Sequence, residues 1–374
     1  MEKIKTSATP ISWVYALVII YASLFPFAGW RNQSIYPWEF LWAPFPLYWT
    51  TYDVSINILG YIPFGFVLTL ADLRVNKRHG RFWSYNWLFA VALSLILEST
   101  QTYLPTRVPS SLDFLLNCIG TFLGVWIAYY FEKYQLIDTW NQIRSRWLIK
   151  DSVGPLACLL TWPLAIVYPP SIPFLMGDIY WAIKKETYTF LGLRPISELL
   201  NNINATPVEI INIESIACVV TGLLIPITLG FSIIPILSHR LWLVFSVSCI
   251  GIGALMLSSA LTFDLVHIFT WFSIYTSIGY LITIIFAIVV LKTTTKTAQY
   301  LLLAVLCIHL LLPNSISSDV YLAQSIQIWE QGKNARFIGL TQWVGLLWPY
   351  VVLVLVIYRL IEKKVSGITM SNQK

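Results

Sequence analysis

The stretch DVSINILGYIPFGFVLTLAD, residues 53–72, begins with polar side chains and then becomes almost wholly apolar. It has the length of a membrane-spanning helix, which needs about 20 residues to cross the hydrocarbon core of a bilayer. Similar apolar blocks recur along the chain, which predicts an all-α, polytopic transmembrane bundle of about ten spans. The predicted spans lie near 11–28, 54–72, 85–103, 114–131, 153–168, 216–237, 241–262, 265–291, 298–312 and 342–360.

The composition excludes an ordinary soluble domain. Hydrophobic residues make up 57% of the 374 positions, charged residues only 11%, and the mean hydropathy is +0.69. Soluble domains carry roughly 25% charged residues, and a soluble fold could not hide this much apolar surface. The five cysteines lie singly inside apolar blocks, so we expect core residues rather than disulfides or metal ligands.

The basic residues fall on alternate sides of the predicted spans. With the N-terminus in the cytoplasm, seventeen of the 24 Lys and Arg residues lie on the cytoplasmic side and seven on the other. This bias follows the positive-inside rule, and Lys363 and Lys364 stay inside only if the number of spans is even. We therefore expect a multi-pass protein of the inner (cytoplasmic) membrane with both termini cytoplasmic. The net charge of +6 then requires no nucleic-acid partner.

The connections between spans predict two regions. Residues 1–150 have compact loops and form a transmembrane domain of four helices, whereas residues 151–374 form a region of about six helices. This second region contains two longer external segments, at about 169–214 and 313–341. Within the first region, the aromatic and proline-rich stretch 36–49 is predicted to lie in the membrane interface, although its rings could also stack on sugars or lipid headgroups.

Polar side chains gather at one depth in the first region. Asp53 and Asn57 share a face of one helix, and the pattern D-x-x-x-N-x-x-G recurs from Asp113 to Gly120, which suggests either a parallel repeat or chance. The predicted span between these two helices runs in the opposite direction, and a stripe of polar residues on it extends to its outer end. The predicted polar pocket at the outer leaflet comprises Asp53, Asn57, Glu98, Gln101, Arg107, Asp113 and Asn117, with an ion pair or shared network around Arg107.

Structural roles compete with a binding role for these residues. Each Asp alone is more readily explained as a cap of its helix, and the three amides can act as glue between helices, so only their clustering favours a site. Gly60, Pro63 and Gly65 are predicted to kink the second span and open a pocket. Gly120 and Gly124 have the small-xxx-small spacing of close helix packing.

In their order and spacing, these residues resemble the signature of the VanZ-like family. The matching positions are Asp53, Asn57, Pro63, Gly65, Glu98, Gln101, Arg107, Asp113, Asn117, Gly120 and Gly124. The resemblance covers residues 10–135 and implies a small helical membrane domain with a link to teicoplanin resistance. The resemblance does not extend to the other residues of the chain, which is much longer than this domain.

The sequence leaves three functions open. No nucleotide or zinc motif is present, so no cofactor and no metal site is predicted, and Arg107 disfavours a cation beside the acids. The first function is a non-enzymatic envelope protein that binds or moves an amphiphile, such as a lipid-linked cell-wall precursor or a lipoglycopeptide. The second is a membrane-embedded hydrolase or transferase, with Glu98 or Asp113 as general acid or base but no assignable nucleophile. The third is a structural scaffold; membrane lipids are partners in all three, and the sequence defines no oligomeric state.

Overall fold

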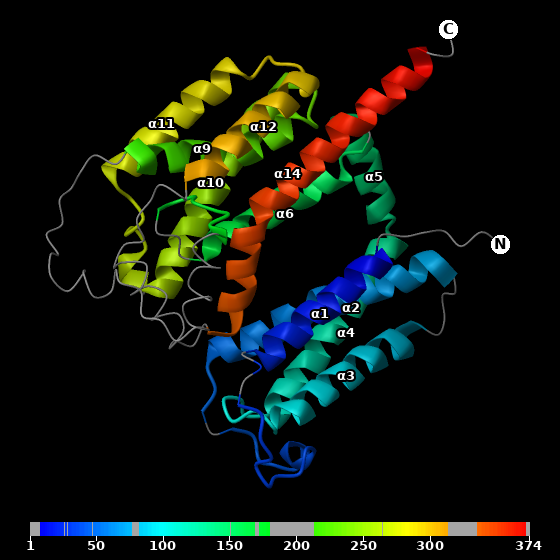
Figure 1. The fold of residues 1–374 in the computed structure, drawn as a ribbon. Helices are drawn as coiled ribbons and strands as arrows, with labels where there is room; N and C mark the ends of the chain where they lie inside the picture. The colour runs from blue at the N-terminus through cyan, green and yellow to red at the C-terminus, as the bar shows by residue number, and fades with distance from the viewer. Residues whose placement is uncertain are drawn as a thin grey trace, which may run out of the picture. The chain divides into compact units, whose positions relative to one another are not determined.

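The computed structural model describes residues 8–25, 27, 29–46, 48–76, 82–149, 151–168, 172–179, 213–263, 265–312 and 335–371. These residues form eleven α-helices and two short 3-10 helices, with no strand among them (Figure 1). The predicted all-α class is confirmed. The chain divides into two compact units, Met1–Ile143 and Arg144–Lys374, here called the N-terminal and C-terminal units.

Several helices have the length and composition of membrane spans. Five apolar segments are long enough to cross a bilayer: Asp53–Leu73, Ser111–Lys133, Ile213–Phe231, Leu237–Thr262 and Thr341–Glu362. Four shorter apolar helices accompany them: Ile11–Leu24, Val153–Val167, Ile274–Val289 and Thr295–Leu311. The protein is therefore a transmembrane helical protein. The total of ten spans and the cytoplasmic placement of both termini stay predictions.

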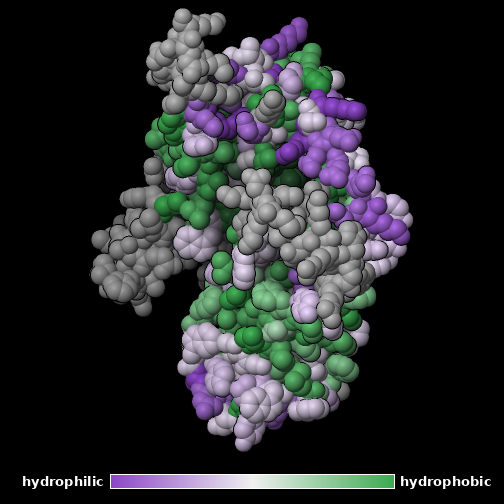
Figure 2. All heavy atoms as spheres, turned by 90° about the vertical axis from the view of Figure 1, so that its right-hand side faces the viewer, coloured by the Kyte–Doolittle hydropathy of each residue, from purple (hydrophilic) through white to green (hydrophobic). Residues whose placement is uncertain are grey.

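The N-terminal unit is built from α1 (Ala8–Leu24), α2 (Thr51–Asn76), α3 (Phe82–Gln101) and α4 (Ser111–Lys133), which pack on one another (Figure 1). A short 3-10 helix, η1 (Glu39–Leu41), lies between α1 and α2. On the face seen in Figure 2, apolar side chains cover the middle of this bundle and more polar ones gather at its lower end. An apolar outer surface is what a bundle surrounded by lipid requires.

The closest helix pair of this unit is α2 with α4, and glycines make the approach possible. A Cβ atom added at Gly65 would overlap the carbonyl oxygen of Thr121, and one added at Gly124 would overlap that of Ile62. A Cβ at Gly120 would lie 2.5 Å from the carbonyl oxygen of Ile58. Contacts on α2 and α4 advance together along the chain from Gly120 to Gly124, so the two helices run in the same direction.

The glycines of α2 have different surroundings. Gly65 packs against α4, and its predicted contribution to a kink stays a prediction. Nothing lies within 4 Å of a Cβ added at Gly60, so this glycine does not serve helix packing. The helix α2 continues through Pro63, and the Tyr15 hydroxyl of α1 donates a hydrogen bond of 3.0 Å to the carbonyl of Gly60, within the turn that precedes the proline. A pocket opened by a kink stays a prediction.

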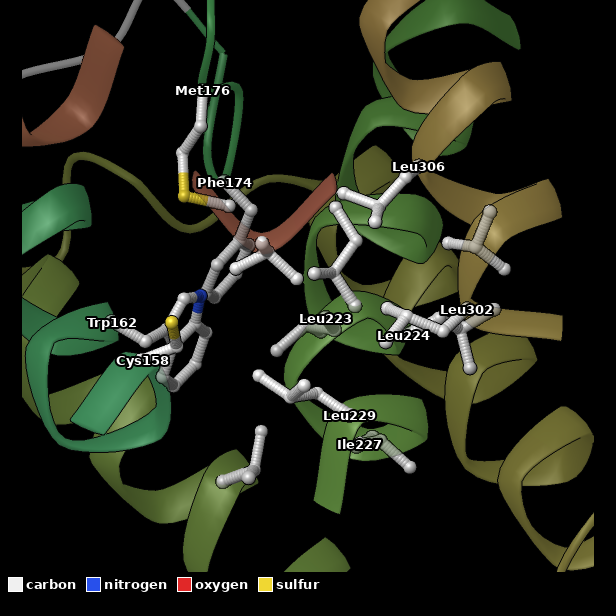
Figure 3. Packing of buried hydrophobic residues seen from close by; sticks show 14 of the residues in the cluster. Cys158, Trp162, Phe174, Met176, Leu223, Leu224, Ile227, Leu229, Leu302 and Leu306 are labelled. Atoms are coloured by element: carbon white, nitrogen blue, oxygen red, sulfur yellow. The ribbon is translucent and has the colours of Figure 1, made fainter. Parts of the chain in front are cut away.

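The C-terminal unit surrounds α9 (Ile213–Phe231), most of whose residues are buried. The helices α6 (Val153–Val167), α10 (Leu237–Thr262), α11 (Ile274–Val289) and α12 (Thr295–Leu311) all pack on it. The long helix α14 (Ala335–Ser371) packs on α6 and α12. The core between them is made of leucine and isoleucine side chains from α9 and α12, with Trp162 of α6 stacked on Phe174 at 6.1 Å (Figure 3). The predicted span 265–291 is helical only over α11 and the short η2 (Leu265–His267).

Residues 172–179 run into this core, although the sequence predicted an external segment there. Phe174 is fully buried and has a left-handed backbone, with φ of 66°. The Met176 amide donates a 3.3 Å hydrogen bond to Nε2 of buried His309, whose Nδ1 lies 2.8 Å from the Thr221 hydroxyl. Non-helical backbone is tolerated within a membrane protein where protein covers it. The predicted external segments end in helices, because α9 begins at Ile213 and α14 at Ala335. Their other residues, 169–171, 180–212 and 313–334, lie outside the described part of the chain.

Arg240, near the start of α10, holds two helix ends together. Its guanidinium donates hydrogen bonds of 2.9 and 2.8 Å to the carbonyls of Phe231, the last residue of α9, and of Ile234 just beyond it. It also donates to the carbonyls of Leu291 and Thr293 after α11, at 2.8 and 2.6 Å. The last carbonyls of a helix have no partner within the helix, and a cation there also complements the helix dipole. Arg240 is therefore a buried clamp on the ends of α9 and α11.

The expectation that all cysteines are core residues is wrong for two of them. Cys158 and Cys218 are buried and Cys118 is half-buried, but Cys249 and Cys307 are exposed on α10 and α12. All five are free thiols in the structure. An apolar block contains lipid-facing as well as core-facing positions, and hydropathy does not distinguish them.

Candidate functional site

The start of α2 is closed by a local capping box. The Thr50 hydroxyl donates a 2.6 Å hydrogen bond to Oδ2 of Asp53, and the Thr50 amide donates to the same oxygen at 3.1 Å. The Asp53 amide in turn donates to the Thr50 hydroxyl at 3.2 Å. These reciprocal bonds satisfy donors that a helix start leaves without partners. They account for Asp53 as a capping residue, the role that its position alone favoured.

The start of α4 has the same residue types but a different arrangement of bonds. The Ser110 hydroxyl accepts from the amides of Leu112 and Asp113 and so caps the helix. The Ser110 amide, however, donates a 3.1 Å bond to Oε2 of Glu98 on α3. Oδ1 of Asp113 accepts a 2.8 Å bond from the Asn57 amide on α2. The helix start therefore connects α4 to both α2 and α3.

A second set of polar contacts lies one turn deeper on α4. The side-chain amide of Asn117 donates a 3.0 Å bond to the Ser94 hydroxyl on α3, and Tyr61 of α2 also interacts with Ser94. Asn117 is buried, and its Oδ1 has no hydrogen-bond partner among the described residues. A buried acceptor without a donor costs roughly 1–3 kcal/mol relative to a paired one. Oδ1 of Asn117 is thus an acceptor that a ligand or a water molecule can satisfy.

Gln101 and Arg107 point to a different target, the end of α1. The Gln101 amide donates to the carbonyl of Ser23 at 3.1 Å. The Arg107 guanidinium donates to the carbonyl of Phe25 at 2.6 and 3.0 Å and to that of Ala22 at 3.3 Å. Both residues therefore satisfy carbonyls left open where α1 ends. The predicted ion pair or shared network between Arg107 and the acids stays a prediction.

The seven predicted residues thus gather at one end of the N-terminal bundle but divide into three groups. Asp53 caps α2, Gln101 and Arg107 hold the end of α1, and the others join α2, α3 and α4. We call this last group, with its two serines and Tyr61, the polar network; its members are Asn57, Tyr61, Ser94, Glu98, Ser110, Asp113 and Asn117. No cluster of three or more His, Cys, Asp or Glu that could hold a metal ion occurs in the described part of the chain.

The comparison with protein families identifies this unit. Residues 8–132 match the model of the VanZ/LLP1 family. These residues are a VanZ-like domain. They make up about a third of the chain. No curated protein and no solved structure matches the chain significantly. With the apolar helices described above, the match supports a membrane protein of the VanZ type.

The VanZ-like domain also carries an aromatic segment, residues 30–49, beside the polar network. Phe40 is buried and its ring lies 6.4 Å from that of Phe114 on α4, whereas Tyr48 is 94% and Trp42 84% exposed. The segment is tied to the loop after α3, because the Gln33 side chain donates to the carbonyl of Thr102 at 2.7 Å. Exposed tryptophan and tyrosine rings are typical of a membrane interface. Interfacial placement of the segment stays a prediction.

Sequence reasoning missed two members of the polar network, Ser110 and Tyr61. For Ser110 a signal was present, because Ser-x-x-Asp before an apolar run marks a helix start. Tyr61 gave no signal, since a tyrosine inside an apolar block is indistinguishable from a core or lipid-facing residue. Ser94 lies on the polar stripe predicted for the third span, but the bond of its hydroxyl to Asn117 depends on how α3 and α4 pack.

Removal of the capping box tests the assignment of Asp53. We expect Asp53→Ala to lower the stability of the purified protein by about 1 kcal/mol, because a helix start loses its cap. Thr50→Ala should have a similar effect, and the double variant little more than either alone, because both residues make the same bonds. Thermal unfolding in detergent measures all three. Fully additive losses would show that Asp53 acts elsewhere.

Proposed function

We propose that the VanZ-like domain binds or moves an amphiphilic molecule of the cell envelope at the polar network, and that it thereby contributes to teicoplanin resistance in the inner (cytoplasmic) membrane. The proposal rests mainly on the start of α4. There the Ser110 amide bonds Glu98 of α3, and Asp113 of α4 bonds Asn57 of α2. Candidate molecules are a lipid-linked cell-wall precursor and a lipoglycopeptide. Both combine an apolar chain, which suits lipid, with amide and hydroxyl groups, which suit carboxylate acceptors.

Three features support a binding role. The carboxyl groups of Glu98 and Asp113 come from two helices and lie at one helix start. Glu98 accepts a hydrogen bond from the Ser110 backbone amide, and Asp113 accepts one from the Asn57 side chain. The Oδ1 atom of Asn117 adds a buried acceptor for which the described part of the chain supplies no donor. Buried polar groups in a membrane domain are costly and usually mark a functional site. The exposed rings of the aromatic segment supply apolar surface for the lipid part of a ligand.

The test compares isosteric variants that remove charge but keep the hydrogen-bond acceptor. In Glu98→Gln and Asp113→Asn the side-chain oxygen can still accept from Ser110 or Asn57, so the helices should stay packed. The matched control is Asp53→Asn, which makes the same chemical change at a carboxylate that serves a local cap. Each variant is expressed in a teicoplanin-susceptible Gram-positive cell, and teicoplanin susceptibility and membrane abundance are measured in parallel.

We expect Glu98→Gln and Asp113→Asn to lose resistance at normal abundance, and Asp53→Asn to retain it. Normal resistance in both site variants would overturn the proposal. Parallel loss of abundance and resistance would instead support the scaffold function, which the capping contacts of Arg107 and Gln101 favour. Equal loss in all three variants would indicate that only the total charge at this end of the bundle matters.

A further inference from the structure

The helix α5 (Leu136–Trp147), which connects the two units, differs from the apolar helices described above. None of its residues is buried. Its sequence, LIDTWNQIRSRW, mixes apolar and polar residues, and at about 1.5 Å per residue its twelve residues are too short to cross a bilayer. It also follows α4 directly, after a turn at Gln135 with φ of 52°, so it starts where a membrane span ends.

Four of the five apolar residues of α5 form one narrow stripe, and Ile137 lies to one side of it. Leu136, Trp140, Ile143 and Trp147 are spaced i, i+4, i+7 and i+11, which places them within about 60° of one another around the helix. Leu136, Trp140 and Trp147 are each between 42% and 50% exposed, so protein covers only part of the stripe. Asp138, Asn141 and Ser145 lie on the opposite side. An uncovered stripe of this kind needs an apolar environment.

Two arginines border the stripe. At about 100° per residue, Arg144 lies to one side of it and Arg146 to the other, and both belong to the last turn of the helix. A long basic side chain beside an apolar stripe can keep its charged end in the headgroup layer while its stem packs on apolar surface. This arrangement is typical of helices that lie in the plane of a membrane surface and bind anionic lipids.

Two contacts within the C-terminal unit hold the last turn of α5 and the residues that follow it. The Trp147 ring stacks on His239 at 4.6 Å, and the Ile149 amide donates a 3.0 Å bond to the carbonyl of Ile233. Ile233 lies in the connection between α9 and α10, and His239 in the first turn of α10. Because α9 and α10 both have the length of a span, their connection marks a membrane surface. The end of α5 is therefore held at that surface.

From these contacts we infer that α5 is an interfacial helix whose stripe of Leu136, Trp140, Ile143 and Trp147 is inserted at the headgroup boundary and whose Arg144 and Arg146 bind anionic phospholipid headgroups. In the predicted orientation this is the cytoplasmic leaflet, which is the leaflet that attracts basic segments next to spans. The occupant is the lipid surface itself. This inference does not depend on the function proposed for the polar network.

The test uses spin labels on the full-length protein in lipid nanodiscs. Cys118, Cys249 and Cys307 are first replaced by alanine, because they are at least partly accessible. A label is then placed at Trp140→Cys on the stripe or at Asn141→Cys on the polar side. We expect the label at 140 to be accessible to oxygen, which concentrates in lipid, and the label at 141 to be accessible to a water-soluble nickel chelate. Equal nickel access at both positions, or shielding of both positions from both reagents, would overturn the inference, since α5 would then lie in water or under protein.

A second comparison isolates the headgroup contacts. In nanodiscs that contain phosphatidylglycerol, the label at 140 should report deeper insertion than in pure phosphatidylcholine, and high salt should remove the difference. Arg144→Gln combined with Arg146→Gln should abolish this lipid dependence, and Arg146→Gln alone, at an exposed position, should reduce it. Lys292→Gln, an exposed basic residue elsewhere in the C-terminal unit, is the matched control and should leave it unchanged. An identical depth in both lipids would refute anionic headgroup binding.

Discussion

Replacing Gly124 by alanine is expected to destabilise the VanZ-like domain strongly, whereas the same change at Gly60 is expected to be harmless. A methyl group at Gly124 would overlap the carbonyl of Ile62 and lie 2.8 Å from the amide nitrogen of Phe66. Both atoms belong to the backbone of α2, so the clash cannot be relieved by rotating a side chain. Forcing the helices apart should cost about 1–3 kcal/mol, as overpacking does, and also weaken the polar network between them.

Gly60 provides the matched control on the same helix pair. A methyl group there meets nothing within 4 Å, and alanine is a better helix former than glycine by roughly 1 kcal/mol. Gly65→Ala should behave like Gly124→Ala, because its methyl group would overlap the carbonyl of Thr121. Membrane abundance and the unfolding temperature of the detergent-solubilised protein measure the three variants. Equal unfolding temperatures for Gly60→Ala and Gly124→Ala would contradict the packing described for α2 and α4.

Replacing Arg240 by methionine is expected to destabilise the C-terminal unit even more. Methionine preserves much of the side-chain volume but leaves the carbonyls of Phe231, Ile234, Leu291 and Thr293 without their donor. Each buried carbonyl without a donor costs roughly 1–3 kcal/mol, although relaxation and water will recover part of this. We therefore expect a loss of several kcal/mol and little protein in the membrane.

The conservative variant separates charge from geometry at this position. Arg240→Lys keeps the positive charge but not the planar fork that reaches two helix ends, so it should rescue only part of the stability. Lys292→Met, an exposed basic residue next to one of the four carbonyls, should leave the unfolding temperature almost unchanged. Full rescue by lysine would mean that charge, rather than the four directed hydrogen bonds, stabilises the connection.

Much of the fold follows from the sequence because hydropathy reports it directly. Each predicted span overlaps an α-helix of the structure, and the polar residues of the first region do lie at one end of their helices. The burial of residues 172–179 could not be predicted, because a short apolar segment between spans looks the same whether it is covered by protein or by lipid. The exposure of Cys249 and Cys307 escaped prediction for the same reason.

The candidate site was predicted as a group of residues but not as a set of contacts. The pattern of Asp, Asn and Gly recurs in the two spans, yet of its two glycines Gly120 lies against the other helix and Gly60 does not. The targets of Gln101 and Arg107 are backbone carbonyls of α1, and a backbone acceptor leaves no trace in a sequence. Side-chain chemistry therefore predicted which residues gather, whereas helix packing decided which atoms they bind.

The hydrogen bonds at the start of α4 couple this helix to both α2 and α3. Ser110 bonds Glu98 of α3 through its amide, and Asp113, less than one turn later, bonds Asn57 of α2. A displacement of this helix start large enough to admit a guest molecule would break both bonds at once, because the two residues move as one rigid turn. Opening at this end of the domain should consequently be cooperative, with a closed state and an open state but no stable half-open intermediate.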